Sequence, residues 1–383
     1  MTKKILISGG PVHAYIDDVK IITNKFRGGL MAQMAENFLE KDDINVVYVC
    51  TKQSKQPSKT KVGKNSSLKI VYHNGIYDYM DIILELAPDM DAVILGAAIA
   101  NLIPKNKIEG KFPSHNYKEG DIIPIDFTIA PRIIDRVKKI APKTQLFGFK
   151  LLSGVNYDEL ISAAYGVLLE SKATAVFAND AMDLMQKYVV TKERGVHPIH
   201  NNEVSQWILD RLDEQYYQTV FEPISFIPDS EKAKFMELVK KYEYLFTHTP
   251  EGYIFGCVAK RVKLASPMDK GKNSFYTTIR GKDETKDCTI VKEVEHDNRM
   301  VVVAQGHARA SLNAPLLHKI FEEREDIETI VHYHGNKNDL TTQAYATPGT
   351  DKDSLRSIMT THPSFNIKGH GCIISFDKEG NML

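Results

Sequence analysis

The first part of the chain, up to about residue 220, alternates β-branched runs with helical patterns, and this alternation constrains the fold most strongly. Lys4–Ser8 is a β-branched run that ends in the pair Gly9-Gly10. Apolar residues at helical spacing follow over 30–39, and Ile44–Cys50 is the next strand. Further strands are expected at 69–73, 91–97, 122–128, 144–149, 174–178 and 188–191, and helices at 79–86, 130–140 and 157–170. Apolar strands that alternate with helices predict an α/β fold, with a Rossmann-like, mostly parallel sheet covered by helices.

The alternation stops near residue 220, where the segment 221–230 carries two prolines and an acidic, cap-like end. We therefore expect a first domain at 1–221, a linker at 222–232 and a second domain at 233–383. Beyond the linker the elements are expected as helices at 231–244 and 312–323, and short strands at 253–258, 274–279, 289–294, 300–304 and 329–333. This texture predicts a smaller α+β unit.

Charge and cysteine content narrow the classes of partner. The chain has 49 Lys and Arg against 49 Asp and Glu, so it carries no basic field for nucleic acid. Its longest apolar stretch, 92–103, falls short of the roughly 20 residues that a membrane helix needs. The 4 cysteines form no CxxC pattern and read as free thiols, which favours a cytoplasmic protein.

The glycine pair after the first strand has two open interpretations. Its backbone N–H groups could cradle a phosphate, or the glycines could serve chain geometry alone. A dinucleotide fingerprint needs GxGxxG opening a helix directly and an acidic residue ending the second strand. Here the helix starts much later and the second strand ends Cys50-Thr51, so an NAD site is disfavoured.

Five segments resemble the phosphopantothenoylcysteine synthetases, also called phosphopantothenate–cysteine ligases. Ile5–Asn24 (ILISGGPVHAYIDDVKIITN) resembles their opening strand, glycine turn and IDxVR and ITN elements. Gly96–Ala100 resembles their AAVAD loop and Lys107-Ile108 their KI element. Gly148–Leu152 (GFKLL) and Ala178–Asp180 (AND) resemble segments of the stand-alone bacterial ligases. The resemblance covers roughly residues 1–220.

The resemblance implies a nucleotide-dependent carboxylate–amine ligase that forms an acyl-nucleotide and releases pyrophosphate. It implies CTP or ATP with Mg²⁺ as cosubstrate, a small carboxylic acid and an amine as substrates, and a coenzyme A biosynthesis-like role. The site residues that follow are catalytic Lys107 and Asn24; nucleotide-binding Gly9, Gly10, Ala97, Asn101, Phe149, Lys150 and Asn179; and substrate-binding Lys20, Asn24 and Ala98. Members of this family, and of a second family that the C-terminal part resembles (described below), are oligomeric. A homo-oligomer, a dimer or higher, is therefore expected.

Several positions depart from the ligase pattern. The arginine of IDxVR is Lys20, which lacks the planar fork that grips a carboxylate or phosphate. The acidic residue that closes the AAVAD loop is Asn101, and Lys25 stands where a serine is usual. These changes leave open a catalytically decayed nucleotide-binding protein.

Histidines mark a second site. His332 and His334 stand two apart in an apolar strand, so both imidazoles lie on one face about 6.5–7 Å apart along the chain. His370 lies between two glycines before another strand. Residues 235–383 resemble the class II aldolase/adducin-like family in their VHxH, PGT and final HG elements. The resemblance implies a divalent metal, Zn²⁺ above others, held by His332, His334 and His370, whereas His307 and His318 are not expected to be ligands.

The usual acid/base of that family is missing. The position of its acidic residue is Asn313, the phosphate-loop asparagine is Cys257, and the second serine of its SSE element is Leu312. An amide exchanges no proton near neutral pH. The prediction is therefore a bifunctional fusion in which the ligase part acts, with a metal-dependent lyase, epimerase or dehydratase on a sugar-like phosphate as the alternative.

Overall fold

The computed structural model describes residues 2–58, 62–223, 229–262, 273–282 and 287–383. The chain divides into two compact units, and each is considered by itself. The first unit comprises Met1–Thr191 and Pro198–Leu212, and the second comprises Lys192–His197 and Asp213–Leu383.

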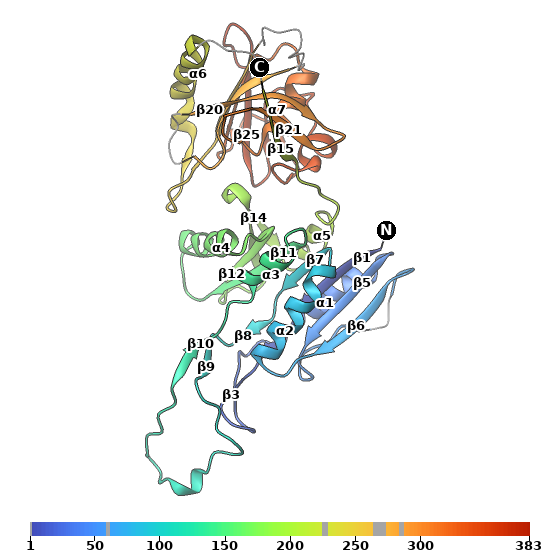
Figure 1. The fold of residues 1–383 in the computed structure, drawn as a ribbon, viewed down its shortest axis with the longest axis vertical. Coiled ribbons are helices and arrows are strands. Elements are labelled where there is room, and N and C mark those ends of the chain that lie inside the picture. The colour runs from blue at the N-terminus through green and yellow to red at the C-terminus, as the bar shows by residue number, and fades with distance from the viewer. Residues whose placement is uncertain (1, 59–61, 224–228, 263–272, 283–286) are drawn as a thin grey trace. The chain divides into compact units, whose positions relative to one another are not determined.

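An eight-stranded sheet forms the centre of the first unit, in the order β14-β13-β12-β11-β7-β1-β5-β6 (Figure 1). Its strands are β1 (Lys3–Ser8), β5 (Ile44–Cys50), β6 (Ser67–Tyr72), β7 (Ala92–Leu95), β11 (Gln145–Leu152), β12 (Ala175–Asp180), β13 (Gln186–Thr191) and β14 (Val196–His200). The six strands from β12 to β6 are parallel to their neighbours, and β13 is antiparallel to β12. The predicted Rossmann-like, mostly parallel sheet is confirmed.

Helices of the first unit pack in two groups. α1 (Gly29–Leu39) contacts α5 (Val204–Leu209), while α2 (Ile76–Leu86), α3 (Ile134–Ile140) and α4 (Tyr157–Ser171) lie side by side. α4 begins with a capping box, in which the Asn156 side chain accepts from the Glu159 amide at 2.9 Å. This reciprocal cap explains why the helix begins where the GFKLL segment ends.

The glycine pair after β1 packs against the start of α1. A Cβ atom on Gly28 would overlap the backbone nitrogen of Gly10, and one on Gly9 would overlap the Tyr48 hydroxyl. Gly28 also has a φ of +85°, which L side chains rarely adopt. The absence of three side chains therefore lets the N-terminus of α1 lie directly on the end of β1.

We expect Gly28→Ala to destabilise the protein by about 1–3 kcal/mol, because the new Cβ meets backbone and the positive φ is strained. Urea denaturation followed by far-UV circular dichroism measures this. Gly29→Ala is the matched control, since the nearest atom to its Cβ would be Lys55 Cδ at 3.9 Å. Equal stability of both variants would contradict the packing argument.

One strand prediction is wrong. The segment 122–128 was expected to join the parallel series, but only β10 (Phe127–Ile129) forms, and it pairs antiparallel with β9 (Leu102–Pro104) outside the main sheet. Pro124 has no N–H for a ladder, and Ile122 is 92% exposed, so the run has no face to bury. β9, β10 and the connection between them form an arm that projects from the sheet (Figure 1).

The arm is held by the turn at 16–20. Asp17 is fully buried, and its side chain accepts from the amides of Val19 and Phe112 at 2.7 and 3.0 Å. The amides of Lys20 and Phe112 hold the pKa of Asp17 well below its usual range. One carboxylate therefore joins the predicted IDxVR-like turn to the arm.

His73, directly after β6, should make the stability of the first unit sensitive to acid. Burial lowers its pKa from 6.5 to about 4. Between these values the unfolded chain binds a proton that the folded chain does not, so the free energy of unfolding falls as pH falls from 7 to 5, by up to about 1.4 kcal/mol per pH unit. We expect His73→Gln to flatten that slope in urea titrations at several pH values, whereas His115→Gln, at an exposed position, should not.

The second unit is built on a nine-stranded, largely antiparallel sheet in the order β15-β21-β20-β19-β18-β22-β25-β24-β23. Its strands are β15 (Gln218–Glu222), β18 (Cys257–Arg261), β19 (Phe275–Thr278), β20 (Cys288–Glu295), β21 (Met300–Ala304), β22 (Thr329–Tyr333), β23 (Thr342–Gln343), β24 (Phe365–Ile367) and β25 (Gly371–Phe376). The two helices that pack on it are α6 (Asp229–Tyr242) and α7 (Ala314–Glu323). The predicted α+β unit is confirmed.

Two apolar cores cover the two faces of this sheet. Cys257 and Ala259 of β18 pack with Phe321 of α7, whereas the intervening Val258 packs with Phe235 of α6. Alternate side chains of a strand point to opposite faces, so α6 and α7 lie on opposite sides. The predicted linker includes residues 224–228, which lie outside the described residues, while β15 pairs with β21 of the second sheet.

Two further observations concern the cysteines and the length of the apolar helices. The four cysteines are buried and free. Within the described ranges, the chain has no helix with the length and apolar character required to cross a bilayer.

Candidate functional site

A cavity of about 1130 Å³ opens in the first unit where its parallel strands end. Its wall includes residues after β7 (Gly96–Ile99), the end of β11 (Phe149–Leu151) and Asn179 at the end of β12. The chain leaves β1 in one direction along the sheet and returns through β7 on its other side. Such a switch point at the carboxyl ends of parallel strands is where open α/β sheets bind ligands.

The charge of the cavity wall suits an anion. Four cationic side chains line it, and one carboxylate, Glu170, stands against them; the cations are Arg27, Arg132, Lys150 and Lys187. Arg132 is engaged by Asp135 at 3.1 Å and by Glu170. Arg27, Lys150 and Lys187 are the cations of this wall that no acidic side chain within ion-pair distance neutralises in the part of the chain described.

The N-terminus of α1 adds to this field. Gly28, Gly29 and Leu30 line the cavity, and no side chain caps the helix. The N-terminus of a helix presents backbone N–H groups and partial positive charge, which together favour phosphate. Of the two glycine pairs, Gly28 and Gly29 line the cavity, whereas Gly9 and Gly10 are packed beneath them.

The structure brings seven of the predicted ligase residues to one wall. Those that line the cavity are Asn24, Ala97, Ala98, Asn101, Phe149, Lys150 and Asn179. Asn24 donates from Nδ2 to the Ile99 carbonyl at 2.8 Å, which fixes its loop to the AAVAD-like segment. Phe149 stacks on Phe177 with ring centroids 5.1 Å apart, so its ring is held by the sheet.

Lys187 is a cavity residue that the sequence reasoning missed. It lies on β13, is only 4% exposed, and donates from Nζ to Asn179 Oδ1 at 3.0 Å. Burial lowers the pKa of its ammonium group to about 8. The sequence does indicate this residue, because strand period two puts Lys187 on the same face as the buried residues Val189 and Thr191. A lysine on a buried strand face needs a partner or a ligand.

Four predicted residues do not line the cavity: Gly9 and Gly10, which pack against the start of α1, and Lys20 and Lys107. Lys20 Nζ pairs with Asp17 at 3.0 Å, and Lys107 Nζ pairs with Asp18 Oδ1 at 2.5 Å. Lys107 is half-exposed and lies on the arm, in the connection between β9 and β10, and the carboxylate of Asp18 raises the pKa of its ammonium group. Neither lysine belongs to the wall of the cavity.

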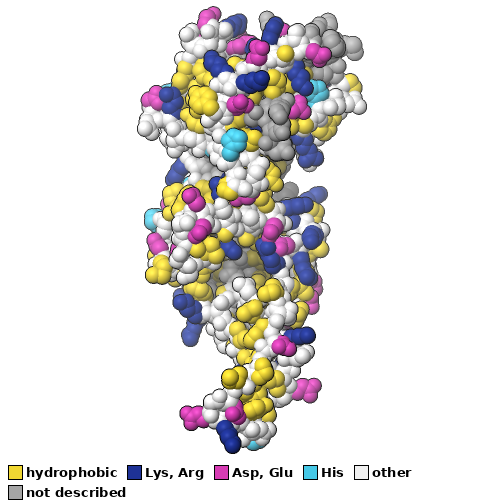
Figure 2. All heavy atoms as spheres, turned by 90° about the vertical axis from the view of Figure 1, so that its left-hand side faces the viewer, with side chains coloured by type: hydrophobic (Ala, Val, Ile, Leu, Met, Phe, Trp, Pro, Cys, Tyr) yellow, Lys and Arg dark blue, Asp and Glu magenta, His cyan; other side chains and the backbone are white. Residues whose placement is uncertain are grey.

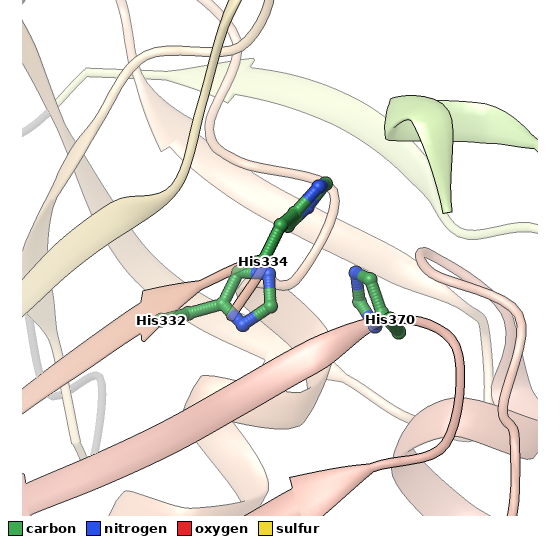
Figure 3. A group of neighbouring side chains, drawn as sticks. All are labelled: His332, His334 and His370. Carbon is green, nitrogen blue, oxygen red and sulfur yellow. The ribbon is translucent and has the colours of Figure 1, made fainter. Parts of the chain in front are cut away.

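The three histidines of the second unit come together (Figure 3). One nitrogen from each of His332, His334 and His370 lies within 4.8 Å of the others. The ring centroids are 4.6 Å apart for His332 and His370, and 5.3 and 5.5 Å for the pairs with His334. His332 is the next-to-last residue of β22, and His370 stands directly before β25, which pairs with β22. Hydrogen bonding between these two strands therefore sets the spacing.

His332 is prepared to act as a neutral ligand. Its Nδ1 lies 3.1 Å from the Cys372 carbonyl, to which it donates, so Nε2 keeps its lone pair. Burial, and then the neighbouring His370 and His334, hold the pKa of His332 well below its usual range. A neutral imidazole fixed by a backbone acceptor is how proteins present histidine to a metal. This donor set fits Zn²⁺ with a fourth position open.

Two of the replaced positions of the aldolase-like pattern, Cys257 and Asn313, are buried. Cys257 of β18 sits opposite His332 of β22 in the sheet register. Asn313 stands at the N-cap of α7, and Leu312 lies against Gly349. Among these three side chains none offers a carboxylate, so the usual acid/base of the resembled family is absent from its expected position.

The fold and cavity define the first unit as an α/β protein with a cavity, lined in part by cationic side chains, at the ends of its parallel strands. Residues 1–213 match the family described as the DNA/pantothenate metabolism flavoprotein C-terminal domain. The chain belongs to this family, which confirms the resemblance to phosphopantothenoylcysteine synthetases in its N-terminal part.

Two curated relatives are named coenzyme A biosynthesis bifunctional protein CoaBC. The protein of Thermococcus kodakarensis is 30% identical over 177 residues, which is 46% of this chain and 41% of that protein. The protein of Methanocaldococcus jannaschii is 26% identical over 217 residues, which is 55% of this chain and 50% of that protein. The chain therefore spans about half the length of the curated relatives it matches.

Similar solved structures exist for each unit. The DNA/pantothenate metabolism flavoprotein from Streptococcus pneumoniae is 22% identical, with a TM-score of 0.47, and covers 55% of this chain and 98% of its own. L-fuculose 1-phosphate aldolase is 17% identical, with a TM-score of 0.29, and covers 39% of this chain and 76% of its own. Because both TM-scores are below 0.5, our description of the fold depends on the sheet topology given above and not on these structures.

Proposed function

We propose that the first unit is a nucleotide-dependent carboxylate–amine ligase that acts in coenzyme A biosynthesis or a similar pathway. The observation that carries the proposal is the cavity at the ends of the parallel strands, with cationic side chains and the N-terminus of α1 in its wall. Membership of the DNA/pantothenate metabolism family and the names of the two relatives support the same reaction class.

The proposed chemistry proceeds in two transfers. A carboxylate oxygen of the acid attacks the α-phosphorus of CTP or ATP, and pyrophosphate leaves to give an acyl-nucleotide. The amine nitrogen then attacks the acyl carbon, loses a proton, and the nucleoside monophosphate departs. Each transfer places negative charge on phosphate oxygens, which preorganised donors stabilise best.

Different residues of the cavity suit the phosphate chain, the nucleoside and the acyl substrate. The N-terminus of α1, with Arg27 beside it, suits the phosphate chain. Phe149 and Lys150 suit the nucleoside side, and Asn24 with Ala98 suits the acyl substrate. Lys187, buried against Asn179, adds a donor at the back of the cavity. Mg²⁺ would neutralise phosphate charge when bound with the nucleotide.

Calorimetric titration with each of the four nucleoside triphosphates in the presence of Mg²⁺ tests the proposal. We expect CTP, before ATP, to bind with micromolar-range affinity. Pyrophosphate release should follow when phosphopantothenate and cysteine, the substrates of the resembled ligases, are added. Failure of every triphosphate to bind would remove the ligase proposal.

Gly166 of α4 offers a direct test of the cavity. It lines the cavity, and a Cβ atom there would meet nothing within 4 Å. We expect Gly166→Leu to lower nucleotide affinity at least about tenfold by filling the space, without loss of stability. Gly166→Ala is the graded control, since it improves helix propensity by about 1 kcal/mol and adds one methyl group. Unchanged affinity in the leucine variant would place the nucleotide elsewhere.

We also propose that the protein acts as a homo-oligomer joined through the arm. Apolar side chains gather on the arm (Figure 2), among them Ile122, 92% exposed, and Ile129, 73% exposed. A contiguous apolar surface of this kind marks a protein interface. Lys107 lies on the arm and not on the cavity wall, so we propose that the arm of another copy brings this lysine to the cavity.

A second candidate function belongs to the three histidines, which would hold a divalent metal in the second unit. A zinc ion with an open position polarises a substrate oxygen, and its bound water supplies a base. We propose metal-dependent lyase, epimerase or dehydratase chemistry on a sugar-like phosphate as the alternative. Asn313 in place of a carboxylate weighs against it, and so the ligase reaction stands first.

A further inference from the structure

We propose that the second unit carries another divalent metal site, formed by His296, His318 and Glu322. One ligand atom from each of these residues lies within 4.8 Å of the other two. His296 stands between β20 and β21, and His318 and Glu322 lie one turn apart on α7. The site is distinct from the cluster of His332, His334 and His370, and it rests on neither proposed activity.

The distance between the two imidazoles fits a shared ion. His296 Nε2 lies 3.4 Å from His318 Nδ1. Two nitrogens bound to one tetrahedral zinc at about 2.0–2.1 Å lie about 3.3 Å apart, so a zinc ion fits between them with little movement. His318 and Glu322 are four apart on a helix, which puts their side chains on one face. A histidine and a carboxylate at this spacing can both face the ion.

A network behind His296 fixes its orientation. Its Nδ1 lies 2.7 Å from the Tyr217 hydroxyl, which also accepts from Ser354 Oγ at 3.0 Å. With Nδ1 donating to Tyr217, the lone pair of Nε2 faces His318. Hydrogen bonds of this kind orient metal-binding histidines and set their tautomer. The network joins the residue before β15 to the turn between β20 and β21.

The surroundings suit a cation. His318 is buried and His296 is half-buried, so the two imidazoles are held beside each other within the fold. Glu322 is exposed and brings the one negative charge of the ligand set, with room for water beside it. The nearby Lys319 donates to the Ile358 carbonyl at 2.7 Å, so its ammonium group has a partner outside the ligand set.

The ligand set indicates a zinc-class ion. Two imidazoles and one carboxylate, with water in the fourth position, match the preferences of Zn²⁺ and of its substitute Co²⁺. An ion here would fasten α7 to the turn between β20 and β21. We therefore assign it a stabilising role for the second unit, separate from any reaction at the three-histidine cluster.

The test uses the full chain without a His-tag, in which His332→Ala/His334→Ala has removed two ligands of the other cluster. After dialysis against micromolar Zn²⁺, elemental analysis should find about one zinc per chain. Adding His296→Ala should abolish that zinc, and adding His307→Ala, outside both clusters, should leave it. Glu322→Gln, at an exposed position, should weaken binding roughly 10–100-fold in competition with a chromogenic chelator.

Cobalt gives an independent readout. Co²⁺ in the His332→Ala/His334→Ala chain should show the intense visible bands of a tetrahedral site, and Glu322→Gln should shift them. Circular dichroism of each metal-free variant checks that it folds. If the His296→Ala chain does not fold, the Glu322→Gln chain still tests the proposal. No zinc in the His332→Ala/His334→Ala chain, or zinc that persists in both the His296→Ala and the Glu322→Gln chains, would overturn the proposal.

Discussion

Replacing His332 and His334 together with alanine is expected to remove one equivalent of bound divalent metal from the purified protein. The two imidazoles and His370 lie within 4.8 Å of one another, and His332 Nε2 is presented in its neutral form. With two of three ligands gone, His370 alone cannot hold zinc against a chelator. Elemental analysis of untagged protein measures the loss. One equivalent of metal should remain, bound by His296, His318 and Glu322.

The matched control is His248→Ala/His362→Ala, since both of these histidines are exposed in the same unit and belong to neither cluster. This control should keep the metal content of the unaltered chain. Zinc should also raise the melting temperature of the unaltered chain in proportion to occupancy, and should raise it less in the His332→Ala/His334→Ala variant. Equal metal content in the variant and the control would show that the three imidazoles hold no ion and are satisfied by hydrogen bonds.

The central sheet was predictable because its signal is local. Strands such as Ile44–Cys50 are apolar at nearly every position, which is typical of strands covered on both faces, and the helical runs between them have one apolar face. The strand expected at 122–128 failed for a tertiary reason. An apolar run predicts burial only where the chain has something to bury it against, and the arm projects away from the sheet.

The candidate sites also include parts that the local sequence predicts and parts that depend on tertiary packing. His332 and His334 were predictable because strand period two puts them on one face. The pairing of His296 with His318 depends on how α7 packs beside the turn after β20, and nothing local indicates it. The resemblance predicts nucleotide binding at Gly9 and Gly10, and in the structure Gly28 packs directly against them. The sequence thus located the turn, while the packing decides which glycines face the cavity.

Replacing Lys107 with alanine is expected to lower ligase turnover by about 10²–10³, the usual cost of losing one donor to a charged transition state. Its ion pair with Asp18 is half-exposed, so the free energy of unfolding should change by less than about 1 kcal/mol. Pyrophosphate release and thermal denaturation measure the two effects. Lys105→Ala, on the same arm and exposed, is the matched control and should keep full turnover.

Mixing two impaired variants, at a nucleotide concentration too low to fill the Gly166→Leu cavity, then asks which copy supplies Lys107. In a dimer of Lys107→Ala with Gly166→Leu, one cavity is open and faces an arm with an intact lysine, provided that the arm comes from the partner. Random mixing gives half mixed dimers with one complete site each, so turnover should return to about a quarter of the unaltered level. If Lys107 acts within its own chain, no mixed site is complete and turnover stays at the level of the parents. Full turnover of the Lys107→Ala variant alone would show that this lysine has no catalytic role.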